Sequence, residues 1–536
     1  MRGRYGAVHA VAPGGRMNLG KLMPVRRGVR VVAASVLALC VAGPLSLGAA
    51  APVAAQLPLR AAEACDVRTP LLVVGGTPAG VAAAVAAARL GTPVYETEAR
   101  PYLGGDLTGP MLNMLDMDFG VTGEHLARGV FAEIYKQLGM TFDVETAKHV
   151  FMDEVKREPL ITLKLHRKPV EVLMTGPWIT GVVFDDPRHG RETVCAKRVI
   201  DATDDGDIAA MAGAPFTIGR EDSGIDRAMM SATLVFEVKD VNWHQVVTYV
   251  TGMREQHMRR GGVYQGNVWG YGPIMRMYKP LQPNVAIYDL NIGLQNDRSV
   301  LINGLLVFGV DGTDPASVAD GMRRAKAELP PLMEFLRETA PGFSKAVLAK
   351  TADYLYIRET RHIRGLHTLT ANDIVNSRVF WDAVGVASYP IDIHPYKMGE
   401  FNPYAPKRFV YTIPFRSLVP YGTANLIMAS RAISATYSAA ASCRVVPTTM
   451  EEGQAAGVAA VISLERRVSV PQLVEQPSLI HELQAGLHEQ GAYLLPDTLA
   501  SLGPASPPEV ERTGTTPRNS IEPSAVPVET ARPTKP

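Results

Sequence analysis

The glycine turn within residues 71–91, LLVVGGTPAGVAAAVAAARLG, constrains the fold more than any other part of the 536-residue chain. The apolar run at 70–74 is typical of a buried parallel strand, and the alanine-rich stretch at 79–91 predicts a helix that ends at Gly91. A strand, a tight turn and a helix in this order open a Rossmann-like dinucleotide-binding domain. We therefore predict an α/β fold with a parallel sheet.

The turn departs at one position from the dinucleotide fingerprint G-x-G-x-x-G, whose glycine positions hold Gly75, Thr77 and Gly80. The first glycine permits the sharp turn and the third permits close packing of helix and strand, and Gly76 adds backbone freedom between them. Thr77 stands where the backbone should approach a pyrophosphate. Its hydroxyl group either holds a phosphate or pushes the ligand outward, while the N–H groups of the helix N-terminus remain available to bind phosphate.

A dinucleotide site also needs an acidic residue at the end of the second strand, about 20 residues further on, to hold ribose hydroxyls. Residues 93–98 predict that strand, and Glu98 lies 18 residues after Gly80. Glu96 is the competing candidate because it shares a strand face with Glu98. We favour Glu98 because it ends the strand, where ligands bind. A carboxylate at this point also disfavours a 2′-phosphate on the ligand.

Four later segments resemble a known family. They are EARPYLGGDLTGP (98–110), KRVIDATDDGDIAAMAGAPFTIGRED (197–222), YIRETRHIRGLHTLTANDI (356–374) and NLIMASRAISATYSAAASCRVVPTTMEEGQAAGVAA (425–460). In these segments the chain resembles the FAD-dependent oxidoreductases of the two-dinucleotide-binding-domain type, which are related to the FAD domain of heterodisulfide reductase. The likeness covers about residues 67–494.

The resemblance implies that the cofactor is FAD, and it adds residues to those of the first turn. In these flavoproteins a Leu-Gly-Gly turn lies beside the ribose and pyrophosphate, a strand-turn lies under the adenine end, and a closing segment lies against the flavin. The positions of this chain that match are Gly104, Gly105, Ala202, Thr203, Arg431, Gly453 and Gln454. Asp204 stands where the family usually has a glycine.

The closing segment predicts a helix that starts near Thr448. Thr448 or Thr449 would be its N-cap, with Glu451 or Glu452 placed for a capping box. Such a helix N-terminus, if it points at the isoalloxazine ring, stabilises negative charge on the reduced flavin. The alternative is a buried helix of small residues that packs under a sheet.

The candidate catalytic residues are His394, Arg361 and Asp392. His394 and Asp392 occupy alternate positions of IDIHPY, so both face one side of an extended segment. A histidine beside a flavin can accept a hydroxyl or amine proton while a hydride leaves, although a single histidine can also be structural. Arg361 forms either a polar cluster with Arg358 and Glu359 or a surface ion-pair network.

Three weaker signals stay open. Tyr411 and Arg416 are lesser candidates for the substrate site. Residues 111–118, MLNMLDMD, are expected to be core or helix packing, although carboxylates and thioethers together are also compatible with a metal. No metal site is predicted.

The first 55 residues are expected to be a signal peptide. Arg26 and Arg27 resemble a twin-arginine signal, the apolar run follows, and Val53 and Ala55 are small residues suited to cleavage before Gln56. An uncleaved membrane anchor and a start at a later methionine remain alternatives. After signal removal no stable membrane span is expected, and the location is secreted or periplasmic.

The cysteines limit the redox chemistry. Cys40 falls in the apolar run, and Cys65, Cys195 and Cys443 permit at most one disulfide, with small buried residues as the preferred interpretation. No C-x-x-C occurs, so an iron–sulfur cluster has no ligand set, and heterodisulfide chemistry is not expected. A net charge of +1 indicates no nucleic-acid partner.

We divide the chain into a first part of an FAD-binding domain at 66–230, an inserted α+β substrate subdomain at 231–400 and a closing part with a C-terminal helix at 401–500. Residues 501–536 are rich in proline, serine and threonine and predict a disordered tail. The predicted function is an exported FAD-dependent oxidoreductase that transfers a hydride or electron pair between a small organic substrate and FAD, with an unknown electron acceptor. The alternatives are an NAD-dependent dehydrogenase and a catalytically silent envelope or carbohydrate-binding scaffold.

Overall fold

The computed structural model of the protein describes residues 65–255 and 261–495. These residues all belong to one unit of the chain, Glu63–Pro536. The predicted signal peptide and the predicted tail lie outside the described residues. Among the residues that are described, no helix is both long enough and apolar enough to cross a membrane.

The first sheet carries the predicted strand–turn–helix unit. Its strand order is β3-β2-β1-β6-β5-β4, with β17 also paired to β6. The strands are β1 (Val67–Val74), β2 (Val94–Glu98), β3 (Ile161–Leu165), β4 (Lys168–Thr175), β5 (Trp178–Asp186), β6 (Gly190–Asp201) and β17 (Leu426–Met428). The pairs among β1, β2, β3, β6 and β17 are parallel, whereas β4, β5 and β6 pair antiparallel. The predicted α/β fold with a largely parallel sheet is confirmed.

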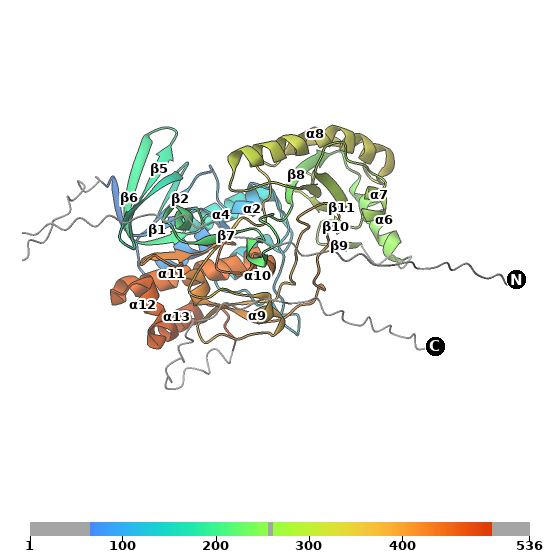
Figure 1. The fold of residues 1–536 in the computed structure, drawn as a ribbon. Coiled ribbons are helices and arrows are strands. Elements are labelled where there is room, and N and C mark those ends of the chain that lie inside the picture. The colour runs from blue at the N-terminus through green and yellow to red at the C-terminus, as the bar shows by residue number, and fades with distance from the viewer. Residues whose placement is uncertain (1–64, 256–260, 496–536) are drawn as a thin grey trace, which may run out of the picture. The chain divides into compact units, whose positions relative to one another are not determined.

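Helices α1 (Pro78–Arg89) and α11 (Val446–Arg466) pack against each other beside this sheet (Figure 1). Their backbones approach closely because α11 presents glycines: a Cβ atom on Gly453 would lie 2.1 Å from the carbonyl oxygen of Ala79, and one on Gly457 would lie 2.3 Å from that of Ala83. The alanine side chains of α1 are buried because α11 packs so closely on this helix. The sequence of small residues therefore specifies a tight helix pair.

The second sheet is antiparallel throughout, in the order β13-β8-β12-β11-β10-β9. Its strands are β8 (Ala232–Lys239), β9 (Gly262–Tyr264), β10 (Asn267–Trp269), β11 (Val285–Leu294), β12 (Val300–Val307) and β13 (Val347–Thr351). The long helix α8 (Pro315–Thr339) packs on it, and the two share an apolar cluster separate from that of the first sheet (Figure 1). These elements fall inside the predicted segment 231–400, whose boundaries stay a prediction.

Shorter elements complete the described part of the fold. Two small antiparallel pairs are β7 (Phe216–Ile218) with β14 (Arg361–Ile363), and β15 (Ala383–Ala387) with β16 (Tyr411–Pro414). The other helices are α2 (Gly105–Thr108), α3 (Val130–Leu138), α4 (Val144–Lys156), α5 (Asp207–Met211), α6 (Trp243–Glu255), α7 (Gly272–Met275), α9 (Ala371–Val375), α10 (Tyr437–Cys443), α12 (Val470–Val474) and α13 (Pro477–Glu489).

One disulfide joins the start of the first sheet. Cys65, just before β1, is bonded to Cys195 in β6. The parallel register of β1 and β6 pairs Arg68 with Cys195 and so brings the two cysteines together. The preferred interpretation of these cysteines as small buried residues was therefore wrong for this pair, because strand register is not visible in the sequence. Cys443 is a free, buried thiol.

Candidate functional site

The turn between β1 and α1 is held by close backbone contacts. Gly75 has φ +109°, and a Cβ atom there would lie 2.4 Å from the carbonyl oxygen of Ala202. A Cβ atom on Gly80 would lie 1.9 Å from the carbonyl oxygen of Gly75. The first glycine is thus required by conformation and the third by contact, as their places in the fingerprint predict.

Thr77 has a structural role that the sequence alternatives did not include. It is the N-cap of α1: its Oγ1 accepts a hydrogen bond from the Gly80 N–H at 3.2 Å and donates one to the Ala202 carbonyl at 3.0 Å. Both bonds are to the protein itself, so the hydroxyl group is used to fix the turn. Thr77 ties α1 to the residue that follows β6.

Glu98 ends β2 and lies against the same turn. Its Oε2 accepts a hydrogen bond from the Gly76 N–H at 2.7 Å, and its Oε1 accepts one from the Arg100 N–H at 2.9 Å. Glu96 is fully buried, and neither of its carboxylate oxygens has a partner. Burial, reinforced by the charge of Glu98, raises the pKa of Glu96 to about 8. Of the two candidate acids, Glu98 is the one that lines a cavity.

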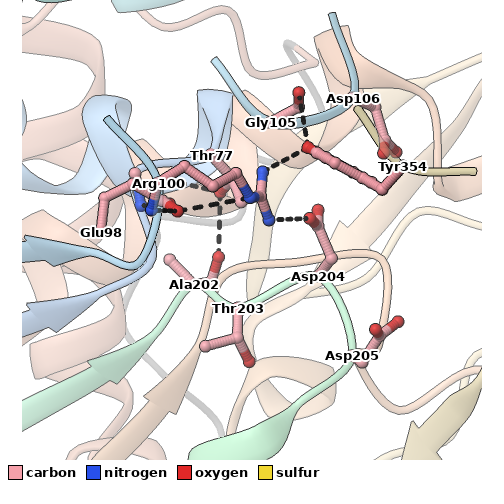
Figure 2. Close-up of polar contacts among 12 residues, drawn as sticks. Thr77, Glu98, Arg100, Gly105, Asp106, Ala202, Thr203, Asp204, Asp205 and Tyr354 are labelled. Atoms are coloured by element: carbon pink, nitrogen blue, oxygen red, sulfur yellow. Dashed lines mark hydrogen bonds and ion pairs between the residues drawn. The ribbon is translucent and has the colours of Figure 1, made fainter. Parts of the chain in front are cut away.

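Arg100 links this turn to the segment that follows β6. Figure 2 shows its guanidinium between Glu98, Tyr354 and Asp204, with ion-pair distances of 3.4 Å to both carboxylates. The guanidinium also lies over the Tyr354 ring, 4.6 Å from its centroid. Tyr354 in turn donates to the Gly105 carbonyl at 3.2 Å. Arg100 is not among the predicted residues, although its position two residues after Glu98 was a usable signal.

Arg431 sits at the centre of an acidic cluster. Its guanidinium lies 2.8 Å from Asp106, 2.9 Å from Asp205 and 3.5 Å from Asp204. Burial raises the pKa of Asp106 to about 7 against the lowering effect of Arg431. The Nε atom of Arg431 is buried and has no hydrogen-bond partner. Asp204, at the position where the sequence resemblance leads us to expect a glycine, therefore contacts both Arg100 and Arg431.

Three cavities next to these residues are connected through shared lining residues. The first, about 310 Å³, lies where β1 and β2 end, and the second is a narrow space of about 30 Å³. The first and second share Thr77 and Asp204, and the second and third share Arg444. The third, about 640 Å³, is lined by Leu112, Asn113, Met114, Asp116, Trp269, Asp289, Asn291, Asn303, Tyr356, Arg358, Tyr389, Asp392, His394 and Arg444. The third cavity is thus a polar chamber that the narrow second cavity connects, through shared residues, to the turn after β1.

The N-terminus of α11 adjoins the second cavity, through Val446 and Thr449. The N-cap is Val445, which offers no side-chain hydrogen bond. The helix therefore starts two residues before Thr448, close to the predicted position, whereas the predicted Thr448 or Thr449 cap and the capping box from Glu451 or Glu452 are wrong. Pro447 in the first turn sets the earlier start, since proline is favoured there. The first N–H groups of α11 have no side-chain cap.

Two of the three predicted catalytic residues meet in the third cavity. Nε2 of His394 lies 3.1 Å from Oδ2 of Asp392, and Arg444 lies 3.3 Å from the same oxygen. Burial, with the charge of Arg358, lowers the pKa of His394 to about 4. Burial would raise the pKa of Asp392, but His394 and the arginines hold it below its ordinary value. At neutral pH the pair is therefore a neutral imidazole beside a carboxylate.

The third candidate, Arg361, lies elsewhere. Its Nη1 contacts Asp207 Oδ1 and the Asp205 carbonyl, both at 2.9 Å, near the first cavity. Arg358, three residues earlier in the same segment, lines the third cavity together with Arg444. The segment at 356–361 thus divides its arginines between two sites, which the residue pattern alone did not separate.

Other predicted residues have structural contacts. Gly453 lies at the crossing of α1 and α11, and Gln454 Oε1 accepts a hydrogen bond from the Val130 N–H at 3.1 Å. Tyr411 is fully buried, and Arg416 pairs with Asp382 at 3.0 Å. None of these four residues lines any of the three cavities.

The remaining predicted residues flank the first and second cavities. Thr203 lines the first cavity and Arg431 the second. The backbone of Gly104 donates to the Gly76 carbonyl at 2.8 Å, so the Leu-Gly-Gly turn packs against the first turn. In the segment 111–118, Asp116 lines the third cavity. No group of three or more histidine, cysteine or acidic residues in the described part is placed to hold a metal ion.

Comparison with known proteins gives one family and several looser likenesses. The model of a family described as FAD dependent oxidoreductase matches residues 70–487. A search of curated proteins finds no match. Among solved structures the chain is similar to the p-nitrophenol 4-monooxygenase PnpA of Pseudomonas putida, with 12% identity, 81% of this chain and 92% of that chain covered, and a TM-score of 0.39. It is also similar to a geranylgeranyl bacteriochlorophyll reductase-like protein of Thermoplasma acidophilum, with 12% identity, 81% and 90% covered, and a TM-score of 0.40. The narrower relation to heterodisulfide reductase stays a prediction.

Proposed function

Because the chain belongs to the FAD dependent oxidoreductase family, we propose that it transfers a hydride or electron pair between a small organic substrate in the third cavity and FAD, and from there to an electron acceptor. The observation that carries this proposal is the position of the His394–Asp392 pair. It lines a polar cavity that shares Arg444 with the cavity at the N-terminus of α11.

The residues along the three cavities fit FAD. Glu98 would hold the ribose, and the N-terminus of α1 with the unpartnered Nε of Arg431 would hold the diphosphate. The uncapped N-terminus of α11 would lie against the isoalloxazine ring. FAD, when bound, supplies a centre that accepts or gives two electrons.

His394 is the residue that we propose to move the substrate proton. The ionised Asp392 accepts a hydrogen bond from Nε2, which places the ring proton on that nitrogen. Nδ1 makes no hydrogen bond with the described residues and is left as the basic atom. Since the pKa of His394 is about 4, this atom is unprotonated at neutral pH. It can therefore accept the hydroxyl or amine proton of a substrate as the hydride leaves.

The purified protein tests this function directly. It should be yellow, and anaerobic addition of the correct compound from a metabolite panel should bleach the flavin absorption. A protein that retains FAD but is bleached by no compound in a broad panel would contradict the proposal.

We also propose that the protein is exported. The predicted signal at 1–55 and the Cys65–Cys195 bond support this, because disulfides persist in oxidising compartments. Fractionation of cells that carry a C-terminally tagged gene should place a shortened protein, which begins near Gln56, in the envelope or the medium. A full-length protein in the cytoplasm would contradict export.

Replacing Glu98 by alanine should weaken FAD retention by about 10- to 100-fold. The change removes the acceptor of the Gly76 and Arg100 N–H groups and the carboxylate that faces the ribose site. FAD bound after gel filtration, and its dissociation constant on reconstitution, measure the effect. Glu96→Gln on the same strand is the matched control and should retain FAD; equal retention in both variants would remove the assigned role of Glu98.

Glu96→Gln should also change how stability depends on pH. A carboxyl group whose pKa is raised in the folded state stabilises that state fully below pH 4.5, and this contribution disappears as the pH rises through about 8. A change from 4.5 to about 8 corresponds to about 5 kcal/mol. The glutamine variant should therefore gain thermal stability over the wild type as the pH increases from 5 to 9. Melting temperatures of the variant and the wild type that fall in parallel as the pH rises would contradict this prediction.

A further inference from the structure

Arg358 is a buried cation without an acidic partner. Only 4% of its surface is exposed, and it lines the third cavity. None of the ion pairs of the described residues includes it, although its neighbours Arg361 and Arg444 both have carboxylate partners. The carboxylates of Asp392 and Asp116 act on the charge of Arg358 from the same cavity, but neither makes a hydrogen bond to it, so the guanidinium keeps donors for an anion from outside the chain.

The guanidinium of Arg358 is already oriented. Its Nη1 donates to the Ser231 carbonyl and to Thr233 Oγ1, both at 2.8 Å, and its plane lies over the Tyr356 ring, 4.3 Å from the centroid. Its Nε atom is buried and has no partner, and its Nη2 makes no hydrogen bond with a described residue. The edge formed by Nε and Nη2 matches the two oxygens of a carboxylate.

The acid–base pair lies next to this edge. Tyr356, on which Arg358 stacks, accepts a hydrogen bond from Arg444 Nη1 at 3.0 Å, and Arg444 also contacts Asp392. The charge of Arg358 acts on His394 directly, as one cause of its lowered pKa. A ligand with its carboxylate on Arg358 would therefore place its neighbouring carbons beside His394.

The second sheet supplies a row of neutral polar groups to the same cavity. Trp269 on β10 pairs in register with Asn291 on β11, which pairs with Asn303 on β12, and all three line the cavity. The side-chain amides of both asparagines make no hydrogen bond with the described residues. Free amides donate to and accept from hydroxyl groups, and an indole ring packs on the C–H face of a polyol.

We propose that the substrate is a polyhydroxylated carboxylic acid, with its carboxylate on the Nε–Nη2 edge of Arg358, a carbinol group at His394 and further hydroxyl groups on Asn291 and Asn303. This inference rests on the proposed function. In the reaction the carbinol C–H and O–H bonds break and a carbonyl group forms. The hydride carries both electrons to FAD, and the proton goes to Nδ1 of His394.

The test compares D-gluconate with D-glucitol, two open-chain compounds that differ only at carbon 1, which is a carboxylate in gluconate and a CH2OH group in glucitol. Binding is measured by calorimetry on holoprotein whose flavin has been reduced beforehand, so that no turnover occurs. Bleaching is measured separately on oxidised holoprotein without oxygen. Gluconate should bind at least about 30-fold more tightly than glucitol and should bleach the flavin.

Arg358→Lys should weaken gluconate binding by about 30-fold and leave glucitol binding unchanged, because lysine keeps the charge but loses the fork. Arg198→Lys is the control. Arg198 is also buried and makes no ion pair with the described residues, but it does not line the third cavity, and its Nε donates a hydrogen bond of 2.7 Å to Ser463 Oγ. If the Arg358 variant loses its FAD or its fold, Asn291→Ala takes its place and should weaken both ligands.

Other results overturn the inference. Equal binding of gluconate and glucitol, or no binding of either, would exclude a polyhydroxylated acid. If another class of compound bleaches the flavin, this inference fails while the proposed function stands. If no compound of any class bleaches it, the proposed function itself fails.

Discussion

Replacing His394 by alanine should slow the reduction of bound FAD by substrate about 10²- to 10⁴-fold while FAD remains bound. The Asp392 carboxylate holds Nε2 of the His394 imidazole, which leaves Nδ1 unprotonated and able to accept the substrate proton. Without it the proton must leave to solvent as the hydride departs. Stopped-flow reduction under anaerobic conditions, with the compound that bleaches the wild type fastest, measures the rate.

The pH profile makes this prediction specific. Because the pKa of His394 is about 4, the base is already free above pH 5.5, and the wild-type reduction rate should be flat from there to pH 8. His362→Gln is the control, since His362 pairs with Glu359 at 3.0 Å outside the cavity. A His394→Ala variant that reduces FAD as fast as the wild type would rule out His394 as the base.

Gly75→Ala should release FAD and destabilise the fold by about 3 kcal/mol or more. At φ +109° an L-residue is strained, and the new Cβ atom would stand 2.4 Å from the Ala202 carbonyl oxygen, which is backbone and cannot move aside cheaply. The turn must open to relieve this contact, and FAD affinity should fall by more than about 100-fold. Flavin content after gel filtration and the thermal unfolding temperature measure both effects.

Gly91→Ala separates strain from contact. Gly91, just after α1, has φ +82°, but a Cβ atom added there would meet no atom within 4 Å. This variant should lose about 1 kcal/mol of stability and keep its FAD. If Gly75→Ala behaves like Gly91→Ala, the close approach to Ala202 does not limit cofactor binding.

The sequence predicts those parts of the fold and of the site that depend on residues close together in the chain. The strand, turn and helix around Gly75 follow from apolar runs and glycine spacing, and the preference for Glu98 over Glu96 follows from its place at the strand end. Pairing between distant segments could not be derived in this way. The Cys65–Cys195 bond depends on the register of β1 with β6, and nothing near either cysteine specifies that register.

The same limit applies to the site. Arg358 and Arg361 occur in one short segment, but Arg361, in β14 paired with β7, contacts Asp207, whereas Arg358 lines the third cavity. The Trp269–Asn291–Asn303 row exists only across three strands. The start of α11 could have been placed better, because Pro447 is a first-turn signal that outweighs the threonines after it.

Thr77 has a consequence for how the protein acquires its cofactor. Its hydroxyl group holds the Gly80 N–H and the Ala202 carbonyl at the same time, so the loop that we propose to bind the diphosphate is set by the polypeptide before any ligand arrives. A preorganised receptor loses little conformational entropy on binding. The apoprotein should therefore keep its architecture, and flavin loading should be reversible rather than coupled to folding.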